Sequence, residues 1–314
     1  MSKIESYEPD FVRSFLSHNP DSPLHTRIVR KNEIRHSLLL TDIASSKAAL
    51  GEPHAFTLHV SCCDREPESR ALSPRDQVLN QAALDTVTLA GLPPELRLYA
   101  LGIILSYSEK LPGDTPDVLR QLASLPQALA GHAEDGKLQE QFAQLPAVLA
   151  LQCQLLTRMG GFDFDWQILP DSSRKISLPL QVSLLMLQDA NSEALLQQQL
   201  QGQWQKTYEQ CFAQAPWILN NYLIYRLYHD VFPQHDSEDV SQRYFELVTD
   251  FYLLRTLFSL WTLDSSALTD DDIFALFALY ERWRLSEDAV FARQQLANQL
   301  PADHLLSAFS LLFC

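Results

Sequence analysis

Glycine is scarce in this sequence, and its scarcity limits the folds that the chain can adopt. Only 9 of the 314 residues are glycine, whereas 17 are proline. Barrels, sandwiches and glycine-rich nucleotide folds need more turn glycines, because glycine adopts positive φ angles without a steric cost. Leucine, alanine and glutamine are abundant, and all three favour helices. The sequence therefore predicts a mostly α protein, a helical array whose turns are marked by proline.

One segment shows the alternation of a β-strand. Phe56, Leu58 and Val60 alternate with polar residues, which predicts a strand. An isolated strand is not stable in water, so we expect a partner strand in 26–29 or 38–41. The sequence thus predicts a small α+β N-terminal region over residues 1–72 and a helical domain over residues 73–314, with no long linker between them.

Several helix ends are marked by local signals. Ser73 is followed by proline, and Thr269 is followed by three aspartates, so both residues are expected to cap the start of a helix. Asp236 or Ser237 is expected to cap the helix that follows Pro233. A further helix is predicted from about residue 136 to residue 159, where a glycine pair follows.

The charge and the cysteines narrow the class of function. The formal net charge of −15 repels phosphate backbones, so we expect no nucleic-acid partner. No apolar run approaches the ~20 residues of a membrane span, and the first residues lack a signal-peptide core, so we expect no membrane association. Five scattered cysteines argue against a disulfide framework. These features predict reduced thiols and a cytoplasmic location.

Local catalytic motifs are missing from the sequence. It contains no G-x-G-x-x-G loop, no P-loop, no G-x-S-x-G, no H-E-x-x-H and no C-x-x-C. The sequence therefore argues against a standard dinucleotide-cofactor site and contains no self-sufficient catalytic motif.

Two groups of residues could bind a metal ion. Cys62 and Cys63 are adjacent, and His59 lies close enough in sequence to join Cys63 on one ion; the alternative is two ordinary thiols at a strand end. The second group flanks the turn at Pro233. It could bind a divalent ion, or it could be a polar helix end. Its members are His229, Asp230, His235 and Asp236.

Two arginines lie within apolar helical stretches. Arg226 and Arg255 must each extend to solvent or pair with a carboxylate if their helices are buried. Glu246, Asp250 and Glu281 are acids that could pair with them. The alternative is that these arginines bind the carboxylate or phosphate of a ligand.

The second half of the chain resembles the bacterial flagellin lysine N-methylase family. Residues 220–233 resemble its N-Y-L-x-x-x-x-F-x-x-x-F-P block, and residues 244–255 resemble its L-V-x-x-Y-x-L-L-R helix. Residues 268–282 are similar to the acidic-capped helix that follows in the family. Residues 92–111 are similar to its R-L-x-x-L-G-x-x-L segment, with Gly102 in place.

The resemblance implies a protein substrate, flagellin, whose lysine receives a methyl group from S-adenosylmethionine. It also implies a pocket that four residues line or support. These are Asn221, Tyr222, Arg226 and Arg255.

One departure from the family leaves two functions open. Family members carry a cysteine cluster near the amino end, whereas residues 16–23 here contain no cysteine. An iron–sulfur cluster needs about four thiolates, so its presence is doubtful, and Cys62 and Cys63 are weak metal candidates. The chain is therefore interpreted as a methylase-like protein, active or degenerate. The alternative is a non-enzymatic helical adaptor or regulatory protein derived from that scaffold.

Overall fold

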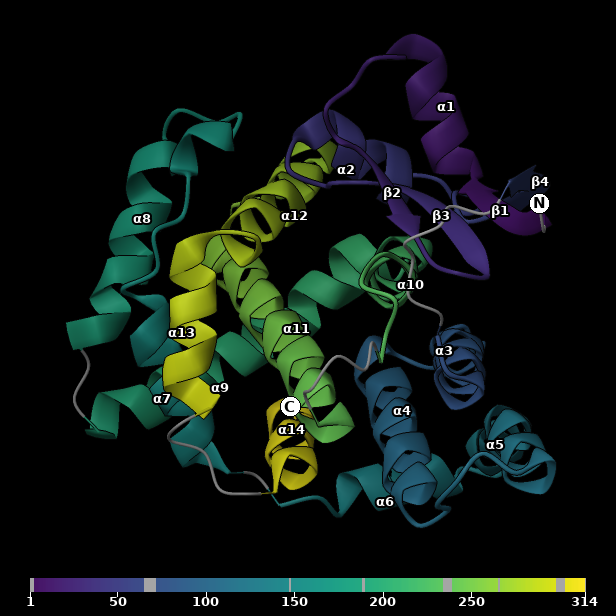
Figure 1. Ribbon diagram of the computed structural model, residues 1–314. Helices are drawn as coiled ribbons and strands as arrows, with labels where there is room; N and C mark the ends of the chain where they lie inside the picture. The colour runs from purple at the N-terminus through teal and green to yellow at the C-terminus, as the bar shows by residue number, and fades with distance from the viewer. Residues whose placement is uncertain are drawn as a thin grey trace.

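The computed structural model describes residues 3–64, 72–146, 148–187, 190–233, 239–264, 266–297 and 303–313. Within these residues the chain forms fourteen α-helices and one sheet of four strands (Figure 1). The predicted fold class, mostly α with a small α+β region near the amino end, is confirmed. Among the described helices, none has both the length and the apolar character that crossing a membrane requires.

The sheet is built entirely from the first 64 residues. Its strand order is β2-β3-β1-β4, with β1 parallel to β3 and the other two pairs antiparallel. β1 therefore lies in the interior of the sheet, and β2 and β4 form its edges. The strands are β1 (Lys3–Pro9), β2 (His25–Val29), β3 (Glu33–Leu38) and β4 (Leu58–Asp64).

The partner that the sequence predicted for β4 was wrong. A strand does form near residue 60, but it pairs with β1 rather than with 26–29 or 38–41. Residues 26–29 belong to β2, which pairs with β3. β1 escaped notice because its buried positions alternate Ile4 with Ser6, so only one large apolar side chain marks the inner face.

Two helices, α1 and α2, lie between the strands in sequence; the others follow the sheet, and α11 lies at the centre of the helical array (Figure 1). Nineteen of the 23 residues of α11 are buried, as expected for a helix that is covered on all sides. The first seven helices are α1 (Asp10–His18), α2 (Ile43–Leu50), α3 (Pro74–Val87), α4 (Pro94–Glu109), α5 (Pro116–Glu134), α6 (Lys137–Ala143) and α7 (Leu149–Met159). The others are α8 (Arg174–Leu184), α9 (Ala190–Thr207), α10 (Trp217–His229), α11 (Val240–Thr262), α12 (Asp270–Arg284), α13 (Glu287–Ala297) and α14 (His304–Leu312).

Most of the predicted helix starts are confirmed. Ser73 Oγ accepts a hydrogen bond from the backbone N–H of Asp76 at 3.0 Å, and Thr269 forms a capping box with Asp272. The single helix expected over 136–159 is instead two helices, α6 and α7, because Pro146 interrupts it. The caps expected at positions 236 and 237 lie outside the described residues. In the structure the N-cap of α11 is Asp239, whose side chain accepts a hydrogen bond from the backbone N–H of Ser241.

The amino-terminal region packs against α10. Trp217 Nε1 donates to the carbonyl of Gly51 at 3.1 Å, and the Tyr228 hydroxyl donates to the carbonyl of Tyr7 at 3.1 Å. These contacts lie at the two ends of α10. They place the turn after β2 beside the end of α10, where a polar cavity opens.

Candidate functional site

A polar pocket of about 440 Å³ opens where α10, α11, α12 and α13 meet the turn after β2. A cavity of this size is typical of sites for small ligands. Apolar walls come from Ile28, Leu227, Phe232 and Leu247. Five arginines and three acidic residues face them, together with one histidine. These polar residues are Arg30, Arg226, Arg243, Arg284, Arg293, Asp230, Glu246, Asp250 and His229.

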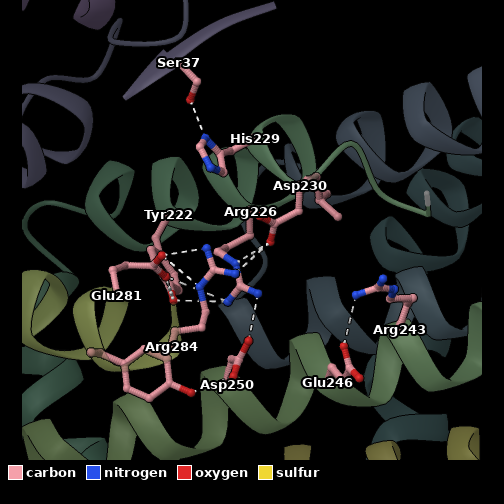
Figure 2. Close-up of polar contacts among 12 residues, drawn as sticks. Ser37, Tyr222, Arg226, His229, Asp230, Arg243, Glu246, Asp250, Glu281 and Arg284 are labelled. Carbon is pink, nitrogen blue, oxygen red and sulfur yellow. Dashed lines mark hydrogen bonds and ion pairs between the residues drawn. The ribbon is translucent and has the colours of Figure 1, made fainter. Parts of the chain in front are cut away.

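Arg226 forms the floor of the pocket. Its Nη2 donates to Asp250 Oδ2 at 2.7 Å and its Nε donates to Asp230 Oδ2 at 3.0 Å (Figure 2). Its Nη1 lies 3.3 Å from the hydroxyl of Tyr222. Only 5% of the Arg226 side chain is exposed, so its charge depends on these neighbours for compensation.

Arg284 lies beside Arg226 and shares its acids. Its Nε donates to Glu281 Oε2 at 2.8 Å, and its Nη1 lies 3.3 Å from Asp230 Oδ2. Tyrosine hydroxyls complete the arrangement: Tyr222 donates to Glu281 Oε1 at 2.8 Å and Tyr280 donates to Asp250 Oδ1 at 2.7 Å. We call these seven residues the buried network: Arg226, Arg284, Asp230, Asp250, Glu281, Tyr222 and Tyr280.

The network keeps Asp230 and Asp250 ionised. Burial alone would raise the pKa of Asp230, but the guanidinium groups of Arg284 and Arg226 hold it well below its ordinary value. Burial likewise opposes ionisation of Asp250, and Arg226, Arg293 and Arg284 together lower its pKa. Burial alone would lower the pKa of Arg226, but the negative charge of Asp250 and of the neighbouring acids outweighs this effect and raises it. The floor is therefore a set of fixed charges at neutral pH.

The rim of the pocket is more exposed than its floor. We define the rim as Arg30, Arg243, Glu246 and Arg293. Arg243 is 40% exposed, and its Nη1 lies 3.4 Å from Glu246 Oε2, one turn before Asp250 in α11 (Figure 2). Arg293 donates to the carbonyl of Arg284 at 2.9 Å and lies 4.0 Å from Asp250 Oδ1. The rim thus carries positive charge in looser contacts than those of the floor.

The backbone beside the pocket is strained. Val231 has a φ of 50°, in the left-handed region that a β-branched residue rarely adopts. It lies between Asp230 and Phe232, which both line the pocket. Asn80 helps to hold this turn, because its Nδ2 donates to the carbonyls of Leu227 and Phe232. Strain of this kind is concentrated at functional sites, so it supports assigning function to this pocket.

His229 is held in place on the side of the pocket that faces the sheet. Its Nδ1 lies 2.8 Å from Ser37 Oγ in β3, and its ring stacks on Tyr225 with centroids 4.9 Å apart. Burial lowers the pKa of His229, so its ring is neutral at pH 7. The structure therefore makes His229 a wall of the pocket rather than an additional cation.

A model of the FliB lysine N-methylase C-terminal domain matches residues 80–308, well over half of the chain. The chain belongs to this family. No curated protein and no solved structure matches the chain. The region matched by the FliB model contains α10, α11, α12 and α13, and so it contains nearly the whole pocket.

The four binding residues expected from the resemblance lie at different places in the FliB-type domain. Arg226 lines the pocket, and Tyr222 lies behind it in the buried network. Asn221 faces the amino-terminal region, where its Nδ2 donates to the carbonyl of Glu52 at 2.8 Å. Arg255 lies further along α11, 3.6 Å from Glu95 Oε1 and 2.8 Å from the carbonyl of Leu311. The structure thus brings Arg226 and Tyr222 together and separates them from Arg255.

The described cysteines do not come together. Cys62 is exposed and Cys63 half-buried, and adjacent residues of a strand point to opposite faces. Cys153 is buried in α7, on the far side of the molecule from β4 (Figure 1), and Cys211 lies in the short helical segment after α9. Cys314 lies outside the described residues. The four described thiols therefore do not fit the roughly four-thiolate set of an iron–sulfur cluster.

The other metal candidates have different partners. His59 Nε2 bonds to Asp10 Oδ1, and the Cys63 thiol lies 3.8 Å from the carbonyl of Ile4. Over the part of the chain that the structure describes, no three His, Cys, Asp or Glu residues are grouped closely enough to hold a metal ion. His235 and Asp236 fall outside that part.

Most of the pocket's arginines were missed from the sequence. Arg284 and Arg293 resemble ordinary charged residues at or near helix ends, and Arg30 belongs to a short basic stretch that Glu33 interrupts. The one available signal was the spacing of Arg226 and Asp230, because residues four apart on a helix face each other.

Proposed function

We propose that this chain is a FliB-type, flagellin lysine N-methylase-like protein, and that the arginine pocket is its ligand site. One observation carries the proposal: the family match over residues 80–308 covers every residue that lines the pocket except Ile28 and Arg30. The strained turn at Val231 and the fixed charges of the buried network add physical support, because both are typical of functional sites.

The residues of the pocket fit S-adenosylmethionine, the methyl donor that the family implies. This molecule carries a carboxylate, an ammonium group and a sulfonium. The rim arginines match the carboxylate, and Glu246, the acid of the rim, matches the cationic groups. The cavity of about 440 Å³ is of suitable size for a small cofactor. When bound, the cofactor supplies a methyl group on a positively charged sulfur.

The pocket has a physical means of activating a lysine. A lysine amine attacks carbon only as the neutral base, and surrounding arginines lower the pKa of an entering ammonium group. Bound S-adenosylmethionine would supply the methyl group, and the lysine nitrogen would have to give up a proton for the transfer to be completed. Glu246 on the rim is an acceptor for that proton, because its carboxyl is partly exposed and its ion pair with Arg243 is long.

The charge of the chain suits a basic protein partner. A net charge of −15 attracts lysine-bearing segments and increases their rate of encounter at low salt. We place the reaction in the cytoplasm, where exposed thiols such as Cys62 remain reduced.

The test is methyl transfer by the purified chain. Flagellin and isotope-labelled S-adenosylmethionine are incubated with the protein, and the lysines of flagellin are examined by mass spectrometry. The expected result is label on lysine, lost in Arg226→Lys and retained in Arg120→Gln on the exposed face of α5. Absence of both label and cofactor binding would overturn the enzymatic proposal.

A non-enzymatic adaptor is the second candidate. It is favoured by the separation of Cys62, Cys63, Cys153 and Cys211, which leaves the family's cysteine cluster without a counterpart among the described residues. In this case the chain binds flagellin without modifying it. Flagellin retained on the immobilised protein, combined with no transfer of label, would support this role.

A further inference from the structure

The arginine pocket carries an excess of positive charge inside an acidic protein. Its five arginines face three acidic lining residues, and Glu281 behind Arg284 adds a fourth. The chain as a whole carries a net charge of −15. A concave site with a net positive charge attracts anions, so this pocket favours a ligand of the opposite charge to the one that the acidic chain as a whole attracts.

The acids of the floor are already occupied by the floor arginines. Asp250 accepts hydrogen bonds from Arg226 at 2.7 Å and from Tyr280 at 2.7 Å. Asp230 lies between Arg226 and Arg284, at 3.0 and 3.3 Å. Glu281 accepts from Arg284 and from Tyr222, both at 2.8 Å. The floor therefore offers little negative charge with which to neutralise a further arginine.

The positive excess consequently lies on the rim. The Nε of Arg30 is buried and has no hydrogen-bond partner within the described part of the chain. Arg293 reaches Asp250 only at 4.0 Å. Arg243 meets Glu246 at 3.4 Å in a partly exposed pair, a contact that contributes little in water. These guanidinium groups come from three separate elements and border one cavity.

We propose that the rim arginines bind the anionic group, a carboxylate or a phosphate, of a small ligand. Guanidinium groups recognise both anions through paired N–H donors, and burial of part of the rim strengthens such bonds. Arg30 follows β2 whereas Arg243 lies on α11, so the bound anion links the amino-terminal region to the matched helical domain. The inference rests on the proposed function only in taking this pocket as the ligand site.

The test uses simple anions, so it does not depend on methyl transfer. Inorganic phosphate and acetate are titrated into the full chain by calorimetry at constant ionic strength. Arg30→Gln and Arg243→Gln are compared with Arg120→Gln, an arginine that is 78% exposed on α5. Circular dichroism and thermal unfolding establish that each variant folds. Arg30→Lys, which keeps the charge but loses the paired donors, serves as a second variant at the same position.

The expected result is binding of at least one anion that weakens about tenfold in each rim variant and is unchanged in Arg120→Gln. Preference for phosphate identifies a phosphorylated ligand, and comparable binding of acetate identifies a carboxylate. No binding of either anion, or binding that Arg30→Gln and Arg243→Gln leave intact, overturns the proposal. Anion binding without methyl transfer would contradict only the proposed methylase activity. Methyl transfer without anion binding would contradict only the proposed anion site on the rim.

Discussion

The guanidinium of Arg226 lies 2.7 Å from the carboxylate of Asp250, and both side chains are almost completely buried. The two residues are on different helices, α10 and α11. A buried ion pair adds little stability compared with an apolar pair of the same size, but the loss of one partner leaves an uncompensated charge in the protein interior. This contact therefore provides a sensitive test of the network.

Asp250→Ala should destabilise the protein by about 3–5 kcal/mol, because Arg226 loses its closest acid inside the core. The free energy of unfolding in urea measures the effect. The matched control is Asp117→Ala, which removes the partner of Arg120 in a pair that is 78% exposed on both sides. It should cost less than about 1 kcal/mol. Equal losses in the two variants would contradict the network.

Two buried tyrosines should respond in opposite ways to loss of their hydroxyl. Tyr280→Phe removes a donor that lies 2.7 Å from Asp250 Oδ1 and should cost about 1.5–3 kcal/mol, as for hydrogen bonds to charged groups. The Tyr225 hydroxyl is buried with no hydrogen-bond partner among the described residues. Tyr225→Phe should therefore be neutral or stabilising. The free energy of unfolding of each variant in urea shows whether the Tyr280 hydroxyl is hydrogen-bonded and the Tyr225 hydroxyl is not.

Stability should decrease as the pH falls below about 6.5. Burial lowers the pKa of His229 in the folded protein, and Asp230 only partly opposes the effect. Below the ordinary value of 6.5 the unfolded chain thus binds more protons than the folded chain, so the free energy of unfolding falls with pH until the folded pKa is passed. His25 and His36 are shifted in the same direction by burial.

His229→Asn should flatten part of this decrease, and the slope that His25 and His36 contribute should remain. The measurement is urea unfolding at pH 5 to 8. A slope identical to that of the unmodified protein would mean that His229 titrates normally in the fold. A second decrease, below the ordinary pKa of aspartate, is expected from Asp230 and Asp250, whose pKa values are lowered in the folded state.

Arg255→Met should weaken folding without affecting the pocket. Arg255 lies 3.6 Å from Glu95 and donates to the carbonyl of Leu311, so its loss leaves a buried acid with less compensation and loosens α14. The expected cost is about 3 kcal/mol. Phosphate and acetate binding should be unchanged at a temperature where the variant is folded. Loss of anion binding there would restore Arg255 as a ligand residue.

Gly102→Ala tests the crossing of α4 and α14. A Cβ at Gly102 would collide with the ring of Phe309 and the hydroxyl of Tyr244, so overpacking should cost about 1–3 kcal/mol. Gly131 within α5 has nothing within 4 Å of the equivalent position. Gly131→Ala should stabilise the protein by about 0.5–1 kcal/mol, because glycine disfavours a helix interior. Thermal unfolding of both variants compares the two sites.

The features predicted correctly from the sequence are those that neighbouring residues determine. Ser73 and Thr269 cap their helices through atoms three residues away, so a short motif is sufficient to identify them. Two of the three acids proposed as partners, Asp250 and Glu281, do contact Arg226, whereas Glu246 pairs with Arg243. Each of these lies in a helix that the residue pattern marked clearly.

The pocket could not be predicted, because five separate segments contribute to it. Arg30 and Arg293 are 263 positions apart in the sequence, and neither belongs to a recognisable motif. The prediction of the strand pairing was wrong for a related reason. β1 has one large apolar side chain on its inner face, so its residue pattern does not mark it as a strand, and its pairing with β4 depends on the tertiary fold. Arg255 pairs with Glu95, an acid from another helix that no local spacing indicates.

The shared acids of the buried network also constrain how such a protein evolves. Asp230 serves two arginines, so no single substitution at Arg226, Arg284 or Asp230 leaves every charge matched. Each one-step path away from the present arrangement passes through a less stable intermediate. Related proteins are therefore expected to keep all three residues or to replace all three. A relative in which only one of them differs should carry a compensating substitution nearby.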